Sequence, residues 1–252
     1  MKCIIFISLF YSLLVAENEY CSISDMMENP SILSRQYYNI GDTISGEDQI
    51  YPHEVCHSDG NYNIGSTFRF SDYSGDIILI SMNATWWPAC YEYVSLMDEL
   101  IEYIDQSEHV QFIVSLDYAE VEPIYYTCQE WGDLYSELGN YGNDPLILNG
   151  DPDQLIWNMF AGTTYSAYVL IDHNMVVRYK FDMPNLYDFQ YNYIPTLLDD
   201  LYGCTDQNAC NYDDIAGIDD GTCEYGDDCI NCSDFTSQSD CMSIPGCMWM
   251  GD

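Results

Sequence analysis

The residue best placed for chemistry is a single cysteine that follows two tryptophans. Residues 86–90 read Trp-Trp-Pro-Ala-Cys, and Cys90 falls where a buried strand is expected to give way to a helix. A thiol in the first turn of a helix is stabilised as the thiolate by the helix dipole, which suits disulfide or peroxide chemistry. The residue types therefore point first to thiol chemistry, with Cys90 as the candidate catalytic residue.

The segments around this cysteine predict an α/β domain. Residues 77–82 and 110–116 are short, apolar and bounded by turn signals, which predicts two buried strands. Between them, apolar residues recur at helical spacing up to Ile104, and Pro88 suits the first turn of that helix. Further predicted elements are a helix over 128–138, a strand over 145–148, a short helix capped by Asp153, a hairpin over 168–179 and a helix over 193–201. This order predicts a central mixed sheet with helices on both faces.

Over about residues 65–202 the chain resembles the thioredoxin fold. The likeness is to exported thiol-disulfide oxidoreductases and redoxins of the alkyl hydroperoxide reductase/thiol-specific antioxidant type. Ala84-Thr85-Trp86 after the first strand and Leu170-Ile171-Asp172 in the hairpin carry most of it. The resemblance implies a thioredoxin-like fold and thiol-disulfide or peroxide chemistry.

The residues depart from that family where its chemistry takes place. The family carries W-C-x-x-C at the junction; here Trp87 stands in place of the attacking cysteine, and Cys90 matches the resolving one. Ser166 stands where the family has a proline facing the dithiol, and Ser81 where thioredoxin has a buried acid. An indole cannot attack a disulfide or a peroxide, so the ordinary dithiol cycle is absent.

Three interpretations of Cys90 remain open. It could form a structural disulfide with Cys21, Cys56 or Cys128, remain an inert buried thiol, or act as a one-cysteine redox centre with a distant partner.

Two functions follow from these interpretations, and whether the chain is an enzyme stays open. The first is a degenerate redoxin that serves as a binding or structural module through an aromatic surface beside Trp86, Trp87 and Ser166. The second is a thiol-disulfide oxidoreductase or peroxide-linked antioxidant that works through Cys90 and a remote cysteine. The expected partner is accordingly an unidentified protein or a thiol substrate.

The first residues predict export. Residues 1–16 have a Lys start and an uncharged apolar run, which is typical of a signal peptide and too short to span a bilayer. The mature chain is then secreted, periplasmic or on the cell surface, and we expect no membrane span later in it. Twelve cysteines agree with an oxidising compartment. We divide the remainder into an N-terminal extension (17–60), the thioredoxin-like domain (61–202) and a tail (203–252).

The charge excludes two classes of partner. Only 5 Lys or Arg stand against 42 Asp or Glu, a formal net charge of −37. A protein without a basic surface does not neutralise phosphates, so nucleic acid and anionic lipid are not expected partners.

The acidic, cysteine-rich tail needs cross-links because it has few aliphatic residues with which to build a core. Its seven cysteines, an odd number, are disulfide candidates: Cys204, Cys210, Cys223, Cys229, Cys232, Cys241 and Cys247. The C-x-x-C at 229–232 could instead be redox-active or half of a zinc site. Four tail carboxylates could hold calcium, although acidic loops are often simply solvated: Asp213, Asp214, Asp219 and Asp220. No other cofactor follows from the residues of the tail.

One further cluster has the residue types of a metal site. Residues 53–57 read His-Glu-Val-Cys-His, and two imidazoles with a thiol could hold copper or zinc. A disulfide at Cys56 is the alternative, and Cys128 is a further disulfide candidate.

Overall fold

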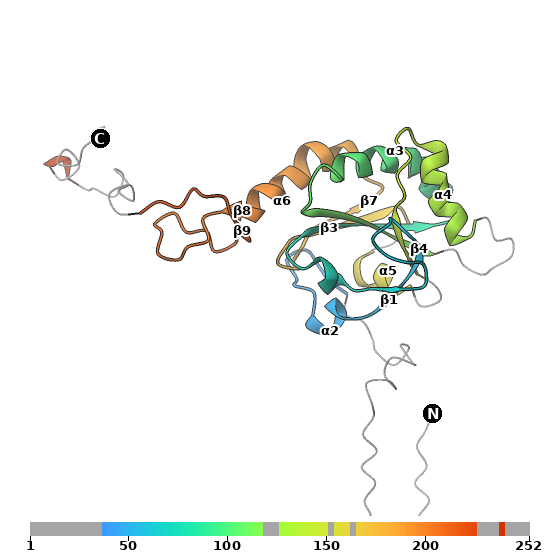
Figure 1. The fold of residues 1–252 in the computed structure, drawn as a ribbon, viewed down its shortest axis with the longest axis horizontal. Helices are drawn as coiled ribbons and strands as arrows, with labels where there is room; N and C mark the ends of the chain where they lie inside the picture. The colour runs from blue at the N-terminus through green and yellow to red at the C-terminus, as the bar shows by residue number, and fades with distance from the viewer. Residues whose placement is uncertain (1–36, 118–125, 151–153, 162–164, 226–236, 240–252) are drawn as a thin grey trace, which may run out of the picture. The chain divides into compact units, whose positions relative to one another are not determined.

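The computed structural model describes residues 37–117, 126–150, 154–161, 165–225 and 237–239, and these are built on a seven-stranded sheet (Figure 1). At its centre β3 (Ile77–Ala84) and β4 (Val110–Asp117) pair in parallel, from Ile77 opposite Val110 to Ala84 opposite Asp117. All eight residues of β3 are buried, as expected for a strand covered on both faces. The two strands therefore end at the same edge of the sheet.

The other strands complete a mixed sheet of order β2-β1-β5-β4-β3-β6-β7. β5 (Leu146–Asn149) is parallel to β4, and β6 (Ala167–Ile171) and β7 (Val177–Asp182) form an antiparallel hairpin beside β3. On the other side β1 (His53–His57) and β2 (Thr67–Phe68) are antiparallel to their neighbours. This topology confirms the predicted thioredoxin-like α/β fold.

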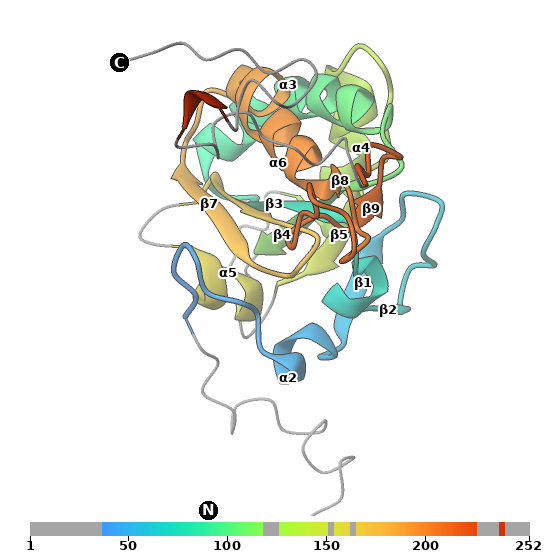
Figure 2. The same cartoon turned by 90° about the vertical axis from the view of Figure 1, so that its left-hand side faces the viewer.

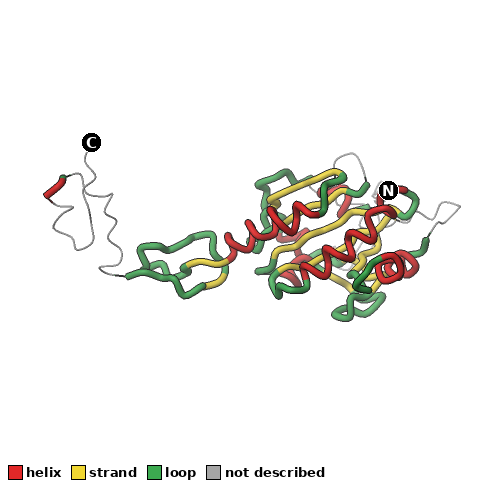
Figure 3. The backbone as a smooth tube through the Cα atoms, turned by 90° about the horizontal axis from the view of Figure 1, so that it is seen from above, coloured by secondary structure: helices red, strands yellow, loops and turns green. Residues whose placement is uncertain are grey.

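Helices cover both faces of the sheet (Figures 1 and 2). Three helices lie on one face: α3 (Pro88–Ile104), α4 (Cys128–Leu138) and α6 (Ile194–Leu201). A π-helical turn over Phe189–Tyr193 precedes α6. The other face is covered by α5 (Leu155–Phe160). Figure 3 shows from above how helices lie over the strands of the sheet. Two short helical segments lie earlier in the chain, α2 (Gly46–Gln49) and the 3-10 helix η2 (Phe70–Tyr73).

Alternation along the strands divides the core in two. On β3, Ile77 and Leu79 belong to the cluster under α3 and α4, whereas Ile78 and Ile80 belong to the cluster that includes Phe160 of α5. Burying each such side chain contributes roughly 1.5–3 kcal/mol, so both helical layers are held mainly by apolar contact.

The sheet already includes residues before 61, the position at which we expected the thioredoxin-like domain to begin after an N-terminal extension. β1 pairs with β5, Tyr38 and Ile44 are buried in the second core, and the Tyr38 hydroxyl donates to Asp48 at 2.6 Å. Val55 is the one aliphatic residue of β1, so the strand has no apolar pattern that marks it in the sequence. The expected cap of α5, Asp153, lies outside the described residues, and Gln154 stands at the N-cap.

The tail departs from the domain where its composition changes. α6 ends at Leu201, and β8 (Tyr202–Gly203) pairs with β9 (Ile218–Asp219). A disulfide joins Cys204 to Cys223, and Cys210 is also disulfide-bonded. Disulfides at these three positions confirm the prediction that the tail is cross-linked. The other tail cysteines lie outside the described residues: Cys229, Cys232, Cys241 and Cys247. The predicted signal segment 1–16 also lies outside them.

A second disulfide, Cys56–Cys128, ties β1 to the start of α4 across 72 residues of sequence. The cross-link lowers the conformational entropy of the unfolded chain. The loop that it closes contains β3, α3 and β4.

Replacing both Cys56 and Cys128 with Ala is expected to lower the free energy of unfolding by about 2–5 kcal/mol, because the unfolded chain loses a long closed loop. Urea denaturation followed by far-UV circular dichroism measures the change. Replacing Cys204 and Cys223 is the matched control and should leave the unfolding of the sheet nearly unchanged. An unaltered midpoint in the first variant would contradict the prediction.

Candidate functional site

The two tryptophans form an exposed aromatic surface at the β3–α3 junction. β3 ends at Ala84 and α3 begins at Pro88, so Trp87 is the N-cap residue of α3 and makes no side-chain cap. Trp86 and Trp87 are 39% and 37% exposed, and their rings meet edge to face at 5.8 Å. An indole therefore occupies the place at which a thiol would meet a substrate.

Cys90 is a free thiol buried beneath this junction. Its side chain is fully buried, and its sulfur accepts hydrogen bonds from the Ser166 hydroxyl at 3.2 Å and the Ala84 amide at 3.4 Å. Burial raises the pKa of the thiol, and these hydrogen bonds oppose that effect only in part. Of the three interpretations of Cys90, the structural disulfide is not formed: Cys90 is a free thiol, and two of its candidate partners, Cys56 and Cys128, pair with each other.

Ser166 lies against Cys90, as the resemblance implies for the residue at the position of the family proline. Its backbone conformation is one that proline does not adopt. It is fully buried and has a φ of 59°, in the left-handed region. Its amide donates to the Met82 carbonyl at 3.0 Å. Proline has no amide hydrogen and fixes φ at about −65°, so this loop excludes it. Because Ser166 is buried, it does not contribute to the exposed aromatic surface that we predicted beside it.

Tyr165 takes that place on the surface. Its ring meets Trp86 edge to face at 5.0 Å, and its hydroxyl donates to the Asp117 carboxylate. The Gln154 amide also donates to Asp117, at 2.6 Å. Sequence reasoning missed this network, although Asp117 ends β4 at the edge where β3 ends, and side chains at that edge of parallel strands commonly meet.

The layer below Cys90 contains hydroxyl groups rather than an acid. Ser81, at the position of thioredoxin's buried acid, donates to the Met97 sulfur at 3.4 Å. The Tyr135 and Tyr168 side chains are buried, and burial raises the pKa of each phenol well above its ordinary value. These phenols stay protonated near pH 7 and do not accept a proton from Cys90.

The His53–His57 cluster is not assembled as a metal site. Cys56 is used by the disulfide, and the His57 ring pairs through Nδ1 with the Pro145 carbonyl at 2.8 Å. Within the described ranges, no group of three or more His, Cys, Asp or Glu side chains could hold a metal ion. The predicted disulfide at Cys56 is confirmed.

The tail aspartates order local turns. Asp213, Asp219 and Asp220 accept backbone N–H groups two residues ahead, at 2.9–3.0 Å. Calcium binding by these three and Asp214 stays a prediction, and in the structure no three of these side chains are grouped around one ion position. No described helix has both the length and the apolar character needed to cross a bilayer.

No protein-family model matches the chain. No curated protein matches it either. Among solved structures, it is similar to a secreted Mycobacterium tuberculosis disulfide oxidoreductase (14% identity, 60% of this chain and 99% of that one, TM-score 0.44). It is also similar to a thioredoxin family thiol:disulfide interchange protein from Chlorobium tepidum (15%, 66% and 99%, TM-score 0.42). A third is a mutant of PrxQ from Xylella fastidiosa (13%, 66% and 98%, TM-score 0.43). At these identities the likeness concerns the fold alone.

In the native protein, Cys90 is expected to react with a thiol reagent on the order of a hundredfold more slowly than after unfolding, since reaction requires local opening and a thiolate. Because its pKa is raised, the rate should stay low even at about pH 8.5, where an ordinary thiol is half ionised. Mass spectrometry after timed alkylation measures this rate, with Cys90→Ala as the blank. Equal rates in the native and unfolded protein would contradict the prediction.

Ser166→Pro is expected to destabilise the fold by about 3 kcal/mol or more, because the ring is incompatible with a positive φ and removes the bond to Met82. Ser166→Gly is the control, since glycine adopts this φ without strain. Urea denaturation compares the two variants; a proline variant as stable as the parent would show that the loop has a second conformation.

Proposed function

We propose that this chain is an exported, non-catalytic thioredoxin-fold module that binds a protein partner through the surface of Trp86, Trp87 and Tyr165. The replacement of the attacking thiol by Trp87, above a fully buried Cys90, carries the proposal. Exposed aromatic side chains with restrained geometry provide binding energy at low entropic cost. Trp86 is restrained in this way between Trp87 and Tyr165.

Export is supported by the cysteines. The disulfides Cys56–Cys128 and Cys204–Cys223 are typical of proteins in an oxidising compartment. The apolar run over residues 1–16 is typical of a signal peptide. The excess of carboxylates favours a partner surface with basic or neutral residues around an apolar centre.

One observation favours the alternative, a thiol-disulfide oxidoreductase or peroxide-linked antioxidant. Cys90 is a free thiol near the start of α3, so exposure of its sulfur during a local opening would allow single-thiol chemistry. Its complete burial and raised pKa oppose this function.

Assays of insulin reduction and of peroxide consumption distinguish the non-catalytic binding module from the oxidoreductase or antioxidant. The parent and Cys90→Ser should show equal rates at background, and Trp87→Cys should gain disulfide reductase activity because it restores an attacking thiol at the N-cap of α3. A parent rate that Cys90→Ser abolishes overturns the non-catalytic proposal.

Binding is tested with unstructured peptides selected from a phage-displayed library on the folded protein. Replacing Trp86 and Trp87 with Ala should weaken the selected peptides about tenfold or more, as for aromatic hot spots. Tyr191→Ala, at a tyrosine that is 74% exposed, is the control and should not change affinity. Equal losses in both variants would assign the peptides to another surface.

A further inference from the structure

Further aromatic side chains adjoin the tryptophan pair. Tyr91 follows Trp87 by one helical turn on α3 and is 38% exposed. Its ring stacks on that of Tyr126, with the centroids 5.9 Å apart and the planes 19° from parallel. Beyond the pair, the Tyr165 ring meets Trp157 at 5.6 Å. We call this set the aromatic cluster: Trp157, Tyr165, Trp86, Trp87, Tyr91 and Tyr126.

The rings at the centre of the cluster stand nearly at right angles to one another. The plane of Trp86 is 88° from that of Trp87 and 77° from that of Tyr165. Such rings present faces and edges in turn instead of one flat platform, so a planar ligand stacks on a single ring only. A chain with a small apolar group at short intervals contacts several of these rings at once.

The indole N–H groups of Trp86 and Trp87 are available as donors at this surface. Within the part of the chain that the structure describes, neither of them donates to another residue. A bound chain with free backbone carbonyls supplies acceptors for them. A polyproline II helix has no internal hydrogen bonds and keeps its carbonyls free, whereas an α-helix uses its carbonyls internally.

The sheet topology excludes strand addition at this surface. β3 lies between β4 and β6, and β4 lies between β3 and β5, so neither strand has a free side. A peptide that adds a strand needs an exposed sheet edge. Among the common modes of peptide recognition, docking of a polyproline II segment on aromatic side chains fits the cluster best.

Carboxylates flank the cluster at both ends. Burial, the neighbouring Tyr91 and the carboxylates of Glu130 and Glu137 raise the pKa of the Tyr126 phenol. At the other end, Asp117 accepts the hydroxyl group of the cluster's Tyr165. No described Lys or Arg forms an ion pair with either glutamate. A basic residue on each side of an apolar segment therefore complements the charge of this surface.

We propose that the aromatic cluster binds a proline-rich segment of the partner protein, in the polyproline II conformation and flanked by Lys or Arg. This inference rests on the proposed function, because it names the class of partner for the same surface. The proline rings pack against the aromatic side chains, and the segment loses little conformational entropy because its helix is preformed.

Fluorescence anisotropy with labelled peptides tests the class of partner. The first peptide has about nine prolines, or three turns of polyproline II helix, between two arginines. It should bind about tenfold or more tightly than a peptide with alternating Gly and Ser in place of the prolines, which loses more freedom on binding. Equal binding overturns the proposal. An alanine-rich helical peptide with the same arginines that binds more tightly also overturns it.

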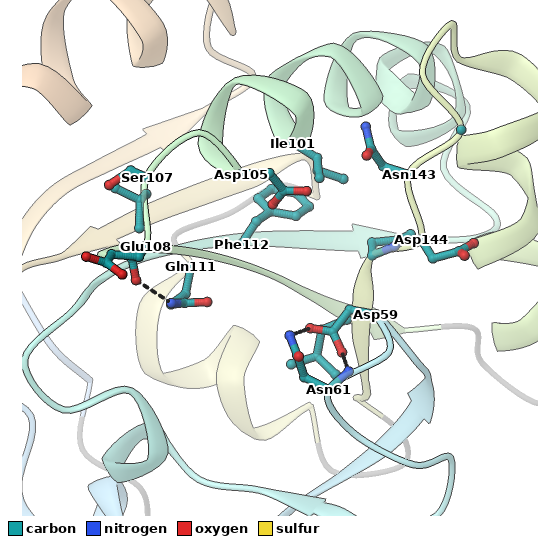
Figure 4. A pocket seen from close by; sticks show the side chains of 14 residues that line it. Asp59, Asn61, Ile101, Asp105, Ser107, Glu108, Gln111, Phe112, Asn143 and Asp144 are labelled. Carbon is teal, nitrogen blue, oxygen red and sulfur yellow. Dashed lines mark hydrogen bonds between the residues drawn. The ribbon is translucent and has the colours of Figure 1, made fainter.

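The basic flanks are tested separately. Exchange of both arginines for glutamate should weaken binding about tenfold. Glu137→Gln, near Tyr126, should weaken the arginine peptide about twofold, as expected for one exposed charge. The control Asp144→Asn removes the same charge from an acidic cleft at the start of β4 (Figure 4) and should bind like the parent. Equal losses in the two variants indicate diffuse attraction to an acidic protein and overturn the basic flanks.

Nuclear magnetic resonance locates the peptide on the parent protein, so this result does not depend on the folding of a variant. The indole N–H resonances of Trp86 and Trp87 should shift when the proline peptide is added. That of Trp131, which is fully buried, should stay in place and is the internal control. Shifts that spare Trp86 and Trp87 overturn the proposal.

Failure of this inference is distinguishable from failure of the proposed function. Peptides from the phage-displayed library that depend on Trp86 and Trp87 but lack proline overturn the inference and leave the binding module intact. If no selected peptide depends on the two tryptophans, the proposed function itself is wrong.

Discussion

The parallel pairing of β3 with β4 sets the position of the candidate functional site. Eight consecutive residue pairs fix the two strands, so Ala84 and Asp117 end at one edge and Ile77 and Val110 begin at the other. The first edge carries the tryptophans, Cys90 and the Tyr165–Asp117 contact. Because both faces of these strands are buried, neither edge can shift without loss of the core.

The sequence predicts the parts of the fold that have strong local patterns. β3, β4, α3, α4 and the β6–β7 hairpin follow from apolar runs, helical spacing and turn residues, and the structure places them where these patterns indicate. β1 escaped prediction because its five residues include two His, one Glu and one Cys, and its partner β5 lies about ninety residues later. Pairing over such a distance leaves no local signal.

The site was predictable in its residue types but not in its geometry. Trp87, Cys90 and Ser166 could be aligned with the family motif, and the structure brings Ser166 against Cys90. Neither the positive φ of Ser166 nor its burial follows from residue type, because both belong to a loop that is held against the Met82 carbonyl across the sheet. The two departures from the family motif lie close together in space. Trp87 stands at the position of the attacking cysteine, and the Ser166 hydroxyl donates a hydrogen bond to the remaining thiol of Cys90.

The Cys56–Cys128 bond gives the chain a covalent ring around its centre. If the two ends of the protein are pulled apart, tension passes from residue 56 directly to residue 128 through sulfur. The residues between them carry none of that load, and they include β3, α3 and β4. Under mechanical stress the β6–β7 hairpin can extend, while the segment that bears Trp86, Trp87 and Cys90 is shielded from the pulling force.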